Sequence, residues 1–470
     1  MGELDDAELE LWVATGLSAK LMNGAKTNAK LIAYALSADG EGIRALARPL
    51  DLGEGSVMPM SVVSSNRHAW LATKTRGVVT VRRDGGGSTC TLTEIATAPT
   101  GAAIGPSHLA LDNSGRWLIA CNCVAPDPSV AVLPINAITG AAEAPVCVVP
   151  HCAERTPRFS DAEALRAELT ACGFAQLKAR AANAGVSAQQ QSDLSREALV
   201  ALAVEKTYRQ SKANPHGCCV DSFSPRGSAW VHVADLGINA LVTYNLDEDT
   251  GKLSQVHEVP LHPGAGPRHV VCGPPVGSTR YMYLVNEMDN TVTALRYDGS
   301  SGMAAPVQTV STIPHTWRQL RDKQAKGRSP GDAPYGYAAE IAVSPCGRFV
   351  YASNRGHNSI VVFECRAAAD PNAPLVLVEY VPTGGATPWG FNIFGPEGCL
   401  VAVPNQWAER LLDGQDDDGG MIGRGIGNVN IFRRDINTGK LSRTNTQVQH
   451  EAALAVAAPT TPSRLRSNRL

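Results

Sequence analysis

The feature of this sequence that most restricts its fold is a repeat of about 50 residues. Each copy has a polar or Pro/His opening, an alternating strand, a turn with Gly-Arg, a second strand that ends on a polar residue, a third strand and often a Thr-Gly turn. A separation of 49 residues lies between Asn66 and Gly115, and one of 51 between Gly347 and Gly398. A period near 50 with about four strands per copy is typical of β-propeller blades.

Seven copies fit the chain. Five are clear, and they begin at Gly105, Asn214, Gly266, Ala338 and Ala386. A more diverged copy begins at Val57, and the N-terminal "LWVATGLSAK…NAKLIAYALSADGEG" resembles the later part of another. The sequence therefore predicts an all-β fold, a seven-bladed β-propeller that forms one domain over residues 1–455. The Ala/Pro/Ser-rich residues 456–470 are predicted to be a disordered tail.

Two segments interrupt the repeat. Residues 151–213 show helical spacing, and Ser160 followed by Glu163 forms a capping-box pattern, which marks a helix start. We predict a helical hairpin inserted between blades, which either decorates the outside or serves as a lid or an oligomer contact. Residues 311–337 are basic and loop-like, and we predict a loop insertion there.

Charge and hydropathy exclude several classes of function. Lys and Arg number 42 against 44 Asp and Glu, so no basic field exists to attract nucleic acid. No apolar run approaches the roughly 20 residues of a membrane span. The N-terminal "MGELDDAELELW" lacks the pattern of a secretory signal, which favours a cytoplasmic protein. As an alternative, Asn468-Arg469-Leu470 resembles a degenerate peroxisomal address.

The 12 cysteines include no C-x-x-C pair, and several lie in strand-like runs. In a long chain without an export signal, this favours reduced and partly buried thiols. No metal-ligand spacing such as H-E-x-x-H occurs, so we expect neither a metal nor another cofactor.

The antiparallel order of a blade predicts where the polar strand ends meet. The start of the first strand and the end of the second lie at the same end of the blade. Arg268 and His269 open one first strand, and Glu287 closes the second strand that follows it. The other pairs formed by the same logic are His108 with Asn122, His216 with Asp235, Glu340 with Asn354-Arg355, and Asn392 with Asn405.

Because the first strand of each blade is the innermost, these residues should surround one mouth of the central channel. The predicted set comprises His108, His216, Asp235, Arg268, His269, Glu287, Glu340, Arg355 and Asn392. A concave site with converging polar groups is the default expectation for ligand binding. The alternative for each residue is a local role, since Asp, His and Asn at blade ends often bond to exposed backbone groups.

Four stretches resemble a known family, the seven-bladed lactonase propellers. They are "NPHGCCVD…VADLG", "GPRHVV…YLVNE", "AAEIAVSPCGRFVYASNR" and "TPWGFNI". The family comprises bacterial-type 6-phosphogluconolactonases and fungal 3-carboxy-cis,cis-muconate lactonizing enzymes. The resemblance places its His, two Arg and Glu of the channel mouth on His216, Arg268, Glu287 and Arg355. The chain departs from the family pattern in "GPPVGSTR" and "GCC", and in its long helical insertion.

The resemblance implies hydrolysis of a small anionic sugar lactone, with 6-phosphogluconolactone preferred. Arg268 and Arg355 are suited to bind phosphate or carboxylate, and Glu287 or His216 to act as base toward water. His108, Asp235, His269, Glu340 and Asn392 would bind substrate. One alternative is a muconate-type lactonizing isomerase, in which His216 or Glu287 delivers a proton to carbon. Another is a propeller without catalysis that serves as an interaction platform.

Overall fold

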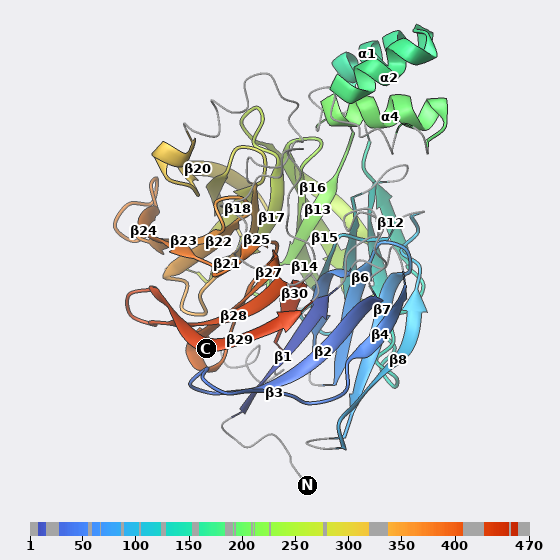
Figure 1. Cartoon of the computed structure of the whole chain (residues 1–470). Coiled ribbons are helices and arrows are strands. Elements are labelled where there is room, and N and C mark those ends of the chain that lie inside the picture. The colour runs from blue at the N-terminus through green and yellow to red at the C-terminus, as the bar shows by residue number, and fades with distance from the viewer. Residues whose placement is uncertain are drawn as a thin grey trace, which may run out of the picture.

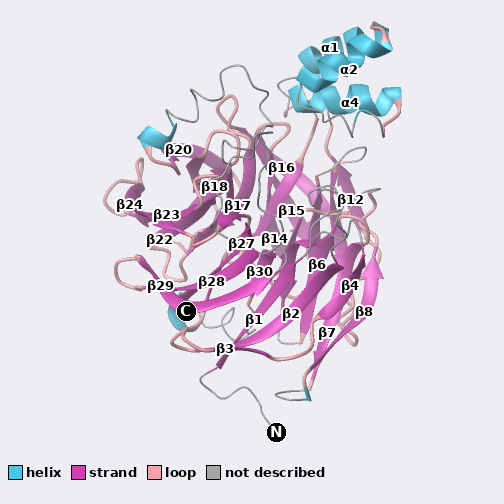
Figure 2. Cartoon of the chain, viewed as in Figure 1, coloured by secondary structure: helices cyan, strands magenta, loops and turns pink. Residues whose placement is uncertain are grey.

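The computed structural model describes residues 8–15, 28–54, 59–65, 67–85, 89–102, 105–123, 128–152, 159–183, 191, 194–207, 210, 212–224, 227–275, 280–318, 337–407, 427–450 and 453–458. Seven antiparallel sheets are arranged around a common axis, which confirms the predicted seven-bladed β-propeller. Figure 1 shows the sheets in chain order, and Figure 2 shows that strands dominate and that the three long helices α1, α2 and α4 lie together at one place.

Blade 1 joins both ends of the described chain. It consists of β1 (Glu8–Thr15), β2 (Asn28–Ser37), β3 (Ile43–Ala45), β4 (Leu50–Glu54) and β30 (Ala453–Ala457). The C-terminal β30 pairs antiparallel with β1 and supplies the innermost strand, so the ring is closed by hydrogen bonds between the first and last strands. The sequence anticipated this split, because its N-terminal copy resembles only the later part of a blade.

Blades 2 to 4 follow in order. Blade 2 consists of β5 (Pro59–Ser64), β6 (His68–Thr73), β7 (Gly77–Asp84) and β8 (Thr91–Ala98). Blade 3 consists of β9 (His108–Leu111), β10 (Trp117–Asn122), β11 (Ser129–Pro134) and β12 (Cys147–Pro150). Blade 4 consists of β13 (Pro215–Val220), β14 (Ser228–Asp235), β15 (Ala240–Asp247) and β16 (Leu253–Pro260).

Blades 5 to 7 complete the ring. Blade 5 consists of β17 (Pro267–Cys272), β18 (Arg280–Asn286), β19 (Thr291–Tyr297) and β20 (Ala304–Ser311). Blade 6 consists of β21 (Ala338–Val343), β22 (Phe349–Asn354), β23 (Ser359–Cys365) and β24 (Leu375–Pro382). Blade 7 consists of β25 (Ala386–Pro388), β26 (Asn392–Phe394), the 3-10 turn η3 (Pro396–Gly398), β27 (Leu400–Trp407), β28 (Gly427–Arg434) and β29 (Leu441–His450).

The core lies between neighbouring blades. The second and third strands are buried on both faces, as in β18, where six of the seven residues are buried. Their apolar side chains pack against the facing sheet, for example Tyr283 and Val285 of blade 5 with Val350 and Ala352 of blade 6. This inter-sheet packing removes apolar surface from water and holds adjacent blades together.

The Thr-Gly turns of the repeat have a local cause. The Asp247 carboxylate accepts hydrogen bonds from the backbone N–H groups of Asp249 (2.9 Å) and Thr250 (3.1 Å). Gly251 then takes a left-handed conformation, with φ of 72°, that glycine adopts without steric cost. The same pattern recurs at Asn136 and Asp435, so the turn is written into the sequence of several blades.

The insertion after β12 contains α1 (Phe159–Ala171), α2 (Phe174–Asn183) and α4 (Arg196–Thr207). They share a small core of their own that includes Leu177, Leu199 and Val204, and they project from one end of the propeller (Figure 1). The helical insertion was predicted as a hairpin, but its described residues form three helices, because the helix is interrupted at Gly173 between α1 and α2. Among the described helices, none combines the length and apolar composition needed to cross a bilayer.

The prediction of a disordered tail from residue 456 is wrong at its start. Val456 and Ala457 lie in β30, where both are buried. The Ala/Pro/Ser-rich composition suggested disorder, but the Ala and Val residues at its start suit an inner strand, because small side chains fit the crowded centre of a propeller. Residues 459–470, with the possible address at 468–470, lie outside the described residues, as do residues 319–336 of the predicted loop insertion.

Candidate functional site

A cavity of about 380 Å³ lies on the axis of the propeller. Its wall comes from the innermost part of all seven blades: strands β5, β9, β13, β17, β21 and β30, and in blade 7 residues 389–393, which include part of β26. Five of the predicted residues line it: His108, Arg268, His269, Glu340 and Asn392. The predicted strand order therefore places residues from four blades in one site, although 284 positions separate His108 from Asn392 in the chain.

Beside the cavity, one carboxylate joins two guanidinium groups. Oε2 of Glu287 lies 3.0 Å from Nε of Arg268 and 3.0 Å from Nη2 of Arg355. All three side chains are at least 89% buried, so water screens these charges weakly. The structure thus brings together the three charged residues that the sequence placed at one mouth.

Trp389 packs over both cations. Its ring centroid lies 4.5 Å from Cζ of Arg355 and 5.8 Å from Cζ of Arg268, within the range of cation–π attraction. Nε1 of Trp389 donates to Oε1 of Gln406 at 2.5 Å, which fixes the indole. Trp389 also lines the cavity.

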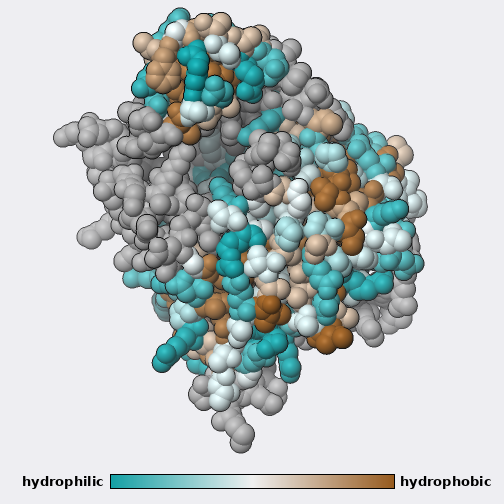
Figure 3. All heavy atoms as spheres, turned by 90° about the vertical axis from the view of Figure 1, so that its right-hand side faces the viewer, coloured by the Kyte–Doolittle hydropathy of each residue, from teal (hydrophilic) through white to brown (hydrophobic). Residues whose placement is uncertain are grey.

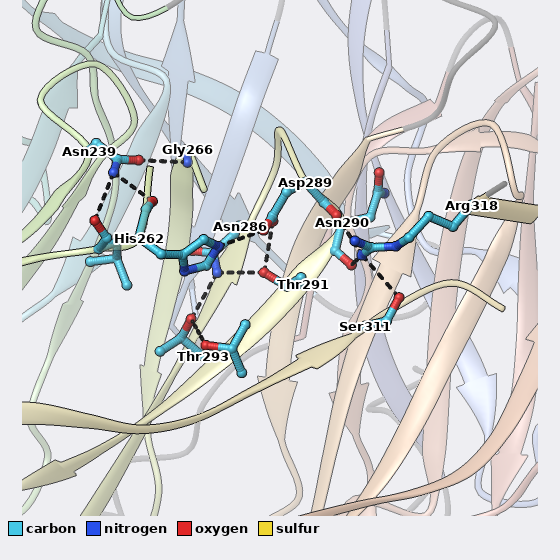
Figure 4. A network of polar contacts seen from close by, with 12 residues as sticks. Asn239, His262, Gly266, Asn286, Asp289, Asn290, Thr291, Thr293, Ser311 and Arg318 are labelled. Carbon is cyan, nitrogen blue, oxygen red and sulfur yellow. Dashed lines mark hydrogen bonds and ion pairs between the residues drawn. The ribbon is translucent and has the colours of Figure 1, made fainter. Parts of the chain in front are cut away.

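Backbone hydrogen bonds position Glu287 and the start of β17. The N–H of Glu287 donates to the carbonyl of Gly266 (2.8 Å), and the N–H of Gly266 donates to Oδ1 of Asn239 in blade 4 (2.9 Å). Nδ2 of Asn286 donates to the hydroxyl of Thr291 (2.8 Å), which holds the turn after β18 (Figure 4). The turn that carries Glu287 is therefore tied to the neighbouring blade.

A second set of contacts extends this network outward. Nε2 of His262 lies 2.7 Å from Oδ2 of Asp289, and Arg318 donates to the carbonyl of Asp289 (2.8 Å) and to the hydroxyl of Ser311 (3.2 Å). Figure 4 shows these side chains in a row beside Asn286. The segment after β20 is thereby fastened to the turn that follows Asn286.

Three imidazoles lie in contact along the channel. The ring centroid of His269 lies 4.5 Å from that of His108 and 5.3 Å from that of His216. Nδ1 of His269 lies 2.7 Å from Oε1 of Glu340, which also accepts the N–H of Ile341 at 3.0 Å. Glu340 therefore fixes the orientation of the His269 ring.

Burial and nearby cations keep two of these rings neutral. Desolvation, followed by the charge of Arg268, lowers the pKa of both His216 and His269 well below the usual range. Burial raises the pKa of Glu340, against the opposing charges of His108 and Arg268. Neutral imidazoles beside a cationic anchor provide proton acceptors at neutral pH.

His216 lies next to this cluster without lining the cavity. Its Nδ1 is buried and has no hydrogen-bond partner within the described part of the chain. Its carbonyl accepts the hydroxyl of Ser107 at 2.9 Å, which ties β13 to blade 3.

Asp235 does not belong to the site. It is fully buried, Oδ1 accepts the N–H groups of Asn214, Gly237 and Ile238, and Oδ2 lies 2.7 Å from Nδ1 of His151. The prediction that Asp235 binds substrate is therefore not supported, because backbone groups and one histidine use its carboxylate. The local alternative considered above holds for this residue.

The polar residues at the ends of the second strands are of two kinds, those that bond to nearby backbone groups and those that reach the charged cluster. Asn122 and Asn354 end the second strands of their blades and donate to the carbonyls of Thr100 (3.1 Å) and Thr312 (2.7 Å), respectively, in the preceding segments. These two asparagines therefore tie the end of the second strand to the segment that precedes their blade. The position that follows such a strand end carries Glu287 in blade 5 and Arg355 in blade 6, and this position reaches the charged cluster.

Sequence reasoning missed Trp389 and the thiols of Cys218 and Cys219 as lining residues. Their positions in the repeat could have identified them, because all three lie in or next to the first strand of a blade, which is the strand nearest the axis. Among the described residues, no group of three or more His, Cys, Asp or Glu side chains is arranged to hold a metal ion.

Fold and site together define a seven-bladed propeller with a small-molecule cavity on its axis. Residues 179–412 match the family model described as "Lactonase, 7-bladed beta-propeller". The resemblance inferred from the sequence motifs is thus confirmed: this chain is similar to the lactonase propellers.

Several curated relatives are named 6-phosphogluconolactonase, including those of Bacillus subtilis and Formosa agariphila. That of Bacillus subtilis is 34% identical over 234 residues, which is 50% of this chain and 54% of the relative. That of Formosa agariphila is 29% identical over 220 residues, 46% of this chain and 50% of the relative. The matches thus span about half the length of these relatives.

Solved structures share the fold over nearly the whole chain. A periplasmic gluconolactonase of Pseudomonas aeruginosa has a TM-score of 0.64 and 21% identity, covering 97% of this chain and all of that one. A putative 6-phosphogluconolactonase of Bacteroides fragilis has a TM-score of 0.62 and 20% identity, covering 98% of this chain and all of that one.

Proposed function

We propose that this protein hydrolyses the lactone ring of an anionic sugar acid in its axial cavity, with 6-phosphogluconolactone as the preferred substrate. The observation that carries the proposal is Arg268, a buried cation that lines a cavity in a chain similar to proteins named 6-phosphogluconolactonase. A volume of 380 Å³ is near the lower end of the range of about 300–1,000 Å³ for ligand sites, which suits a single sugar ring.

Arg268 is the proposed anchor for the substrate anion. Its Nε faces Glu287 and its Nη1 donates to the carbonyl of Ala339 at 2.6 Å. Its Nη1 also lies 3.2 Å from Nε2 of His269, and a guanidinium group can bind phosphate or carboxylate through two parallel hydrogen bonds. Glu287 and Trp389 hold the guanidinium in place, so little side-chain freedom is lost on binding.

His269 is the proposed general base. A lactone is opened by water, which must lose a proton as it attacks the carbonyl carbon. His269 is uncharged at neutral pH, lines the cavity and is oriented by Glu340.

This assignment changes the roles expected for Glu287 and His216. Both oxygens of a carboxylate can accept protons, but Oε2 of Glu287 is shared by two cations, and Glu287 does not line the cavity. We therefore assign Glu287 and Arg355 to positioning Arg268. His216 extends the imidazole cluster, and His108 and Asn392 are proposed to contact the substrate.

The test is turnover of 6-phosphogluconolactone and of unphosphorylated gluconolactone by the wild type and by Arg268→Ala. We expect wild-type turnover of the phosphorylated lactone, and a loss in the variant of roughly 100-fold in kcat/KM, since a charge-assisted pair contributes about 1.5–3 kcal/mol. Arg82→Ala is the matched control, because Arg82 pairs with Asp84 at the surface, away from the cavity. No turnover of either lactone above the spontaneous rate contradicts the proposal.

The same assay includes the two alternatives. Cyclisation of a carboxymuconate without lactone hydrolysis would assign the isomerase activity, since the same cations would hold its carboxylates.

The second alternative, an interaction platform, requires apolar surface at the ends of the blades. The large exposed hydrophobic side chains among the described residues include Ile138, Val146, Val256, Met303 and Leu377, which lie on outer strands and turns, and Figure 3 shows apolar patches interspersed with polar ones on one face.

Two further predictions from the sequence remain proposals. We propose that the seven blades and the insertion unfold as one domain, because β1 and β30 close the ring. A cytoplasmic location is retained as a prediction, to be checked with a fluorescent fusion.

A further inference from the structure

Strand β13 carries two adjacent cysteines that face different neighbours. Because successive residues of a strand point to opposite faces, Cys218 packs with Cys121 in the core between blades 3 and 4. Cys219 packs on the other side, against the core between blades 4 and 5, together with Cys272 of β17. Two pairs of thiols therefore connect three consecutive blades.

The outer pair of thiols is in contact. Sγ of Cys219 lies 3.6 Å from Sγ of Cys272. Strands β13 and β17 approach closely, since a Cβ on Gly217 would lie 2.6 Å from the carbonyl oxygen of Arg268. Both cysteines are partly exposed, and Cys219 lines the cavity, whereas Cys121 is completely buried. Cys218 also lines the cavity but is only 3% exposed, and its neighbour Cys121 is fully enclosed, so the outer pair is the one in which both thiols are partly accessible.

We propose that Cys219 and Cys272 are a redox modification site that forms a reversible disulfide between blades 4 and 5 when a peroxide enters the cavity. This inference does not depend on the proposed lactonase activity. The cross-link would join β13 to β17, the strand that also carries Arg268 and His269, and so would place a covalent tie in the wall of the site.

The chemistry proceeds in two balanced steps. The Cys219 thiolate attacks one oxygen of hydrogen peroxide; the O–O bond breaks, a sulfenic acid forms, and the departing hydroxide takes up the thiol proton as water. The Cys272 sulfur then attacks the sulfenic sulfur; the S–S bond forms, the S–O bond breaks, and a second water leaves with the Cys272 proton. Two thiols are oxidised and one peroxide is reduced.

The order of attack follows from the surroundings of the two sulfurs. The hydrogen bond with Cys219, together with burial, raises the pKa of Cys272 well above its usual value. Cys272 is therefore disfavoured as the first thiolate, and it acts as the resolving thiol. Cys219 lines the cavity and meets the peroxide first.

The experiment treats the full-length reduced protein with hydrogen peroxide, blocks the remaining thiols and digests it with trypsin without reductant. We expect mass spectrometry to find the peptide 213–226 linked to the peptide 269–280, lighter than their sum by two hydrogen atoms, and we expect dithiothreitol to separate them. Because peptide 213–226 contains both Cys218 and Cys219, variants must identify the bond.

Cys219→Ser should abolish the linked peptide, and Cys218→Ser, the matched control on the opposite face of β13, should retain it. Oxidation of Cys219 to sulfinic or sulfonic acid without the linked peptide overturns the proposal, and so does a linked peptide that persists in Cys219→Ser. The wild-type digest alone decides whether the link forms, even if a variant fails to fold.

Discussion

Arg268 lies on β17 and Glu287 directly follows β18 in blade 5, and Oε2 of Glu287 is 3.0 Å from Nε of Arg268. Arg355 of blade 6 approaches the same oxygen at the same distance. One carboxylate thus joins two blades through two cations. This relationship makes Glu287 the residue that holds the anion anchor in place, and it explains why Glu287 need not touch the substrate to matter for turnover.

Replacing Glu287 by Gln should destabilise the fold as well as reduce activity. The substitution leaves two buried guanidinium groups without a counter-charge, which typically costs about 3–5 kcal/mol. We expect a lower midpoint in urea unfolding and a fall of 10-fold or more in kcat/KM, taking about 1.4 kcal/mol per tenfold change. Glu364→Gln is the control, since Glu364 and Arg366 are exposed and such pairs contribute at most about 1 kcal/mol. Equal urea midpoints for both variants would show that the ion pairs of Glu287 with Arg268 and Arg355 do not stabilise the fold.

The pH dependence of turnover should report the low pKa of His269. A general base works when deprotonated, so activity is lost as the pH falls through its pKa. Burial and Arg268 lower this pKa, and the acidic limb of kcat/KM should therefore lie below the value of about 6.5 that is usual for histidine. His269→Ala should remove the limb together with most of kcat. A limb centred at or above 6.5 in the wild type would assign the base to another group.

The Glu340→Gln variant should show whether Glu340 orients the His269 ring or binds the substrate. The amide keeps the size of the side chain, but it loses the carboxylate that holds Nδ1 of His269 at 2.7 Å. We expect kcat to fall about tenfold with KM little changed, because the anion is held by Arg268. Steady-state kinetics on the phosphorylated lactone measure both constants. A rise in KM with unchanged kcat would instead place Glu340 in substrate binding.

The fold was predictable because its information is local and repeated. The turn chemistry of Asp247 to Gly251 recurs in other blades, and the strand order then fixes which residues meet at the axis. The site was predictable only in part. Arg268 and Glu287 follow from strand topology, but the sequence could not distinguish Asp235, whose carboxylate bonds to nearby backbone N–H groups, from a ligand-binding acid.

Other features depend on packing between blades and were not visible in the sequence. Trp389 reaches Arg355 from blade 7, and the Cys219 and Cys272 thiols meet across blades 4 and 5. No spacing rule relates these positions, because the rotation between blades and the side-chain directions set the contacts. The inner strand β30 was missed for a different reason, since its Ala-rich composition is typical of tails as well.

Glu10 should make stability depend on pH near neutrality. It lies on β1 and faces Arg83 of blade 2 at 3.2 Å, with only 8% of the residue exposed. Burial, only partly opposed by Arg83, raises its pKa from 4.5 to about 7. The native state therefore binds more protons than the unfolded state between these values, and stability falls as the pH rises from about 4.5 to 7.

The measurement compares wild type with Glu10→Gln by urea unfolding at pH 5, 6, 7 and 8. Relative to wild type, the free energy of unfolding of the variant should increase across this range, by no more than about 3 kcal/mol, because each pKa unit corresponds to about 1.36 kcal/mol. A difference that stays constant with pH would mean that Glu10 titrates normally in the folded protein.

Strand β30 should be required for the whole ring. It pairs with β1, and Leu454, Ala455, Val456 and Ala457 are buried in it. A chain that ends after Ala452 loses these side chains and their ladder of hydrogen bonds, so blade 1 presents an open edge to the channel. Burial of one Leu and one Val alone contributes about 3–6 kcal/mol, a large part of typical domain stability.

The matched control ends after Ala458 and keeps β30. We expect the control to melt at the wild-type temperature, and the shorter chain to melt far lower or to aggregate when both are followed by circular dichroism. Addition of a synthetic peptide of residues 451–458 should restore part of the loss, because it can pair with β1 in place of the missing strand. Equal melting of both truncated chains would show that the ring closes without β30, and that the pairing of the first and last strands is not what holds the propeller together.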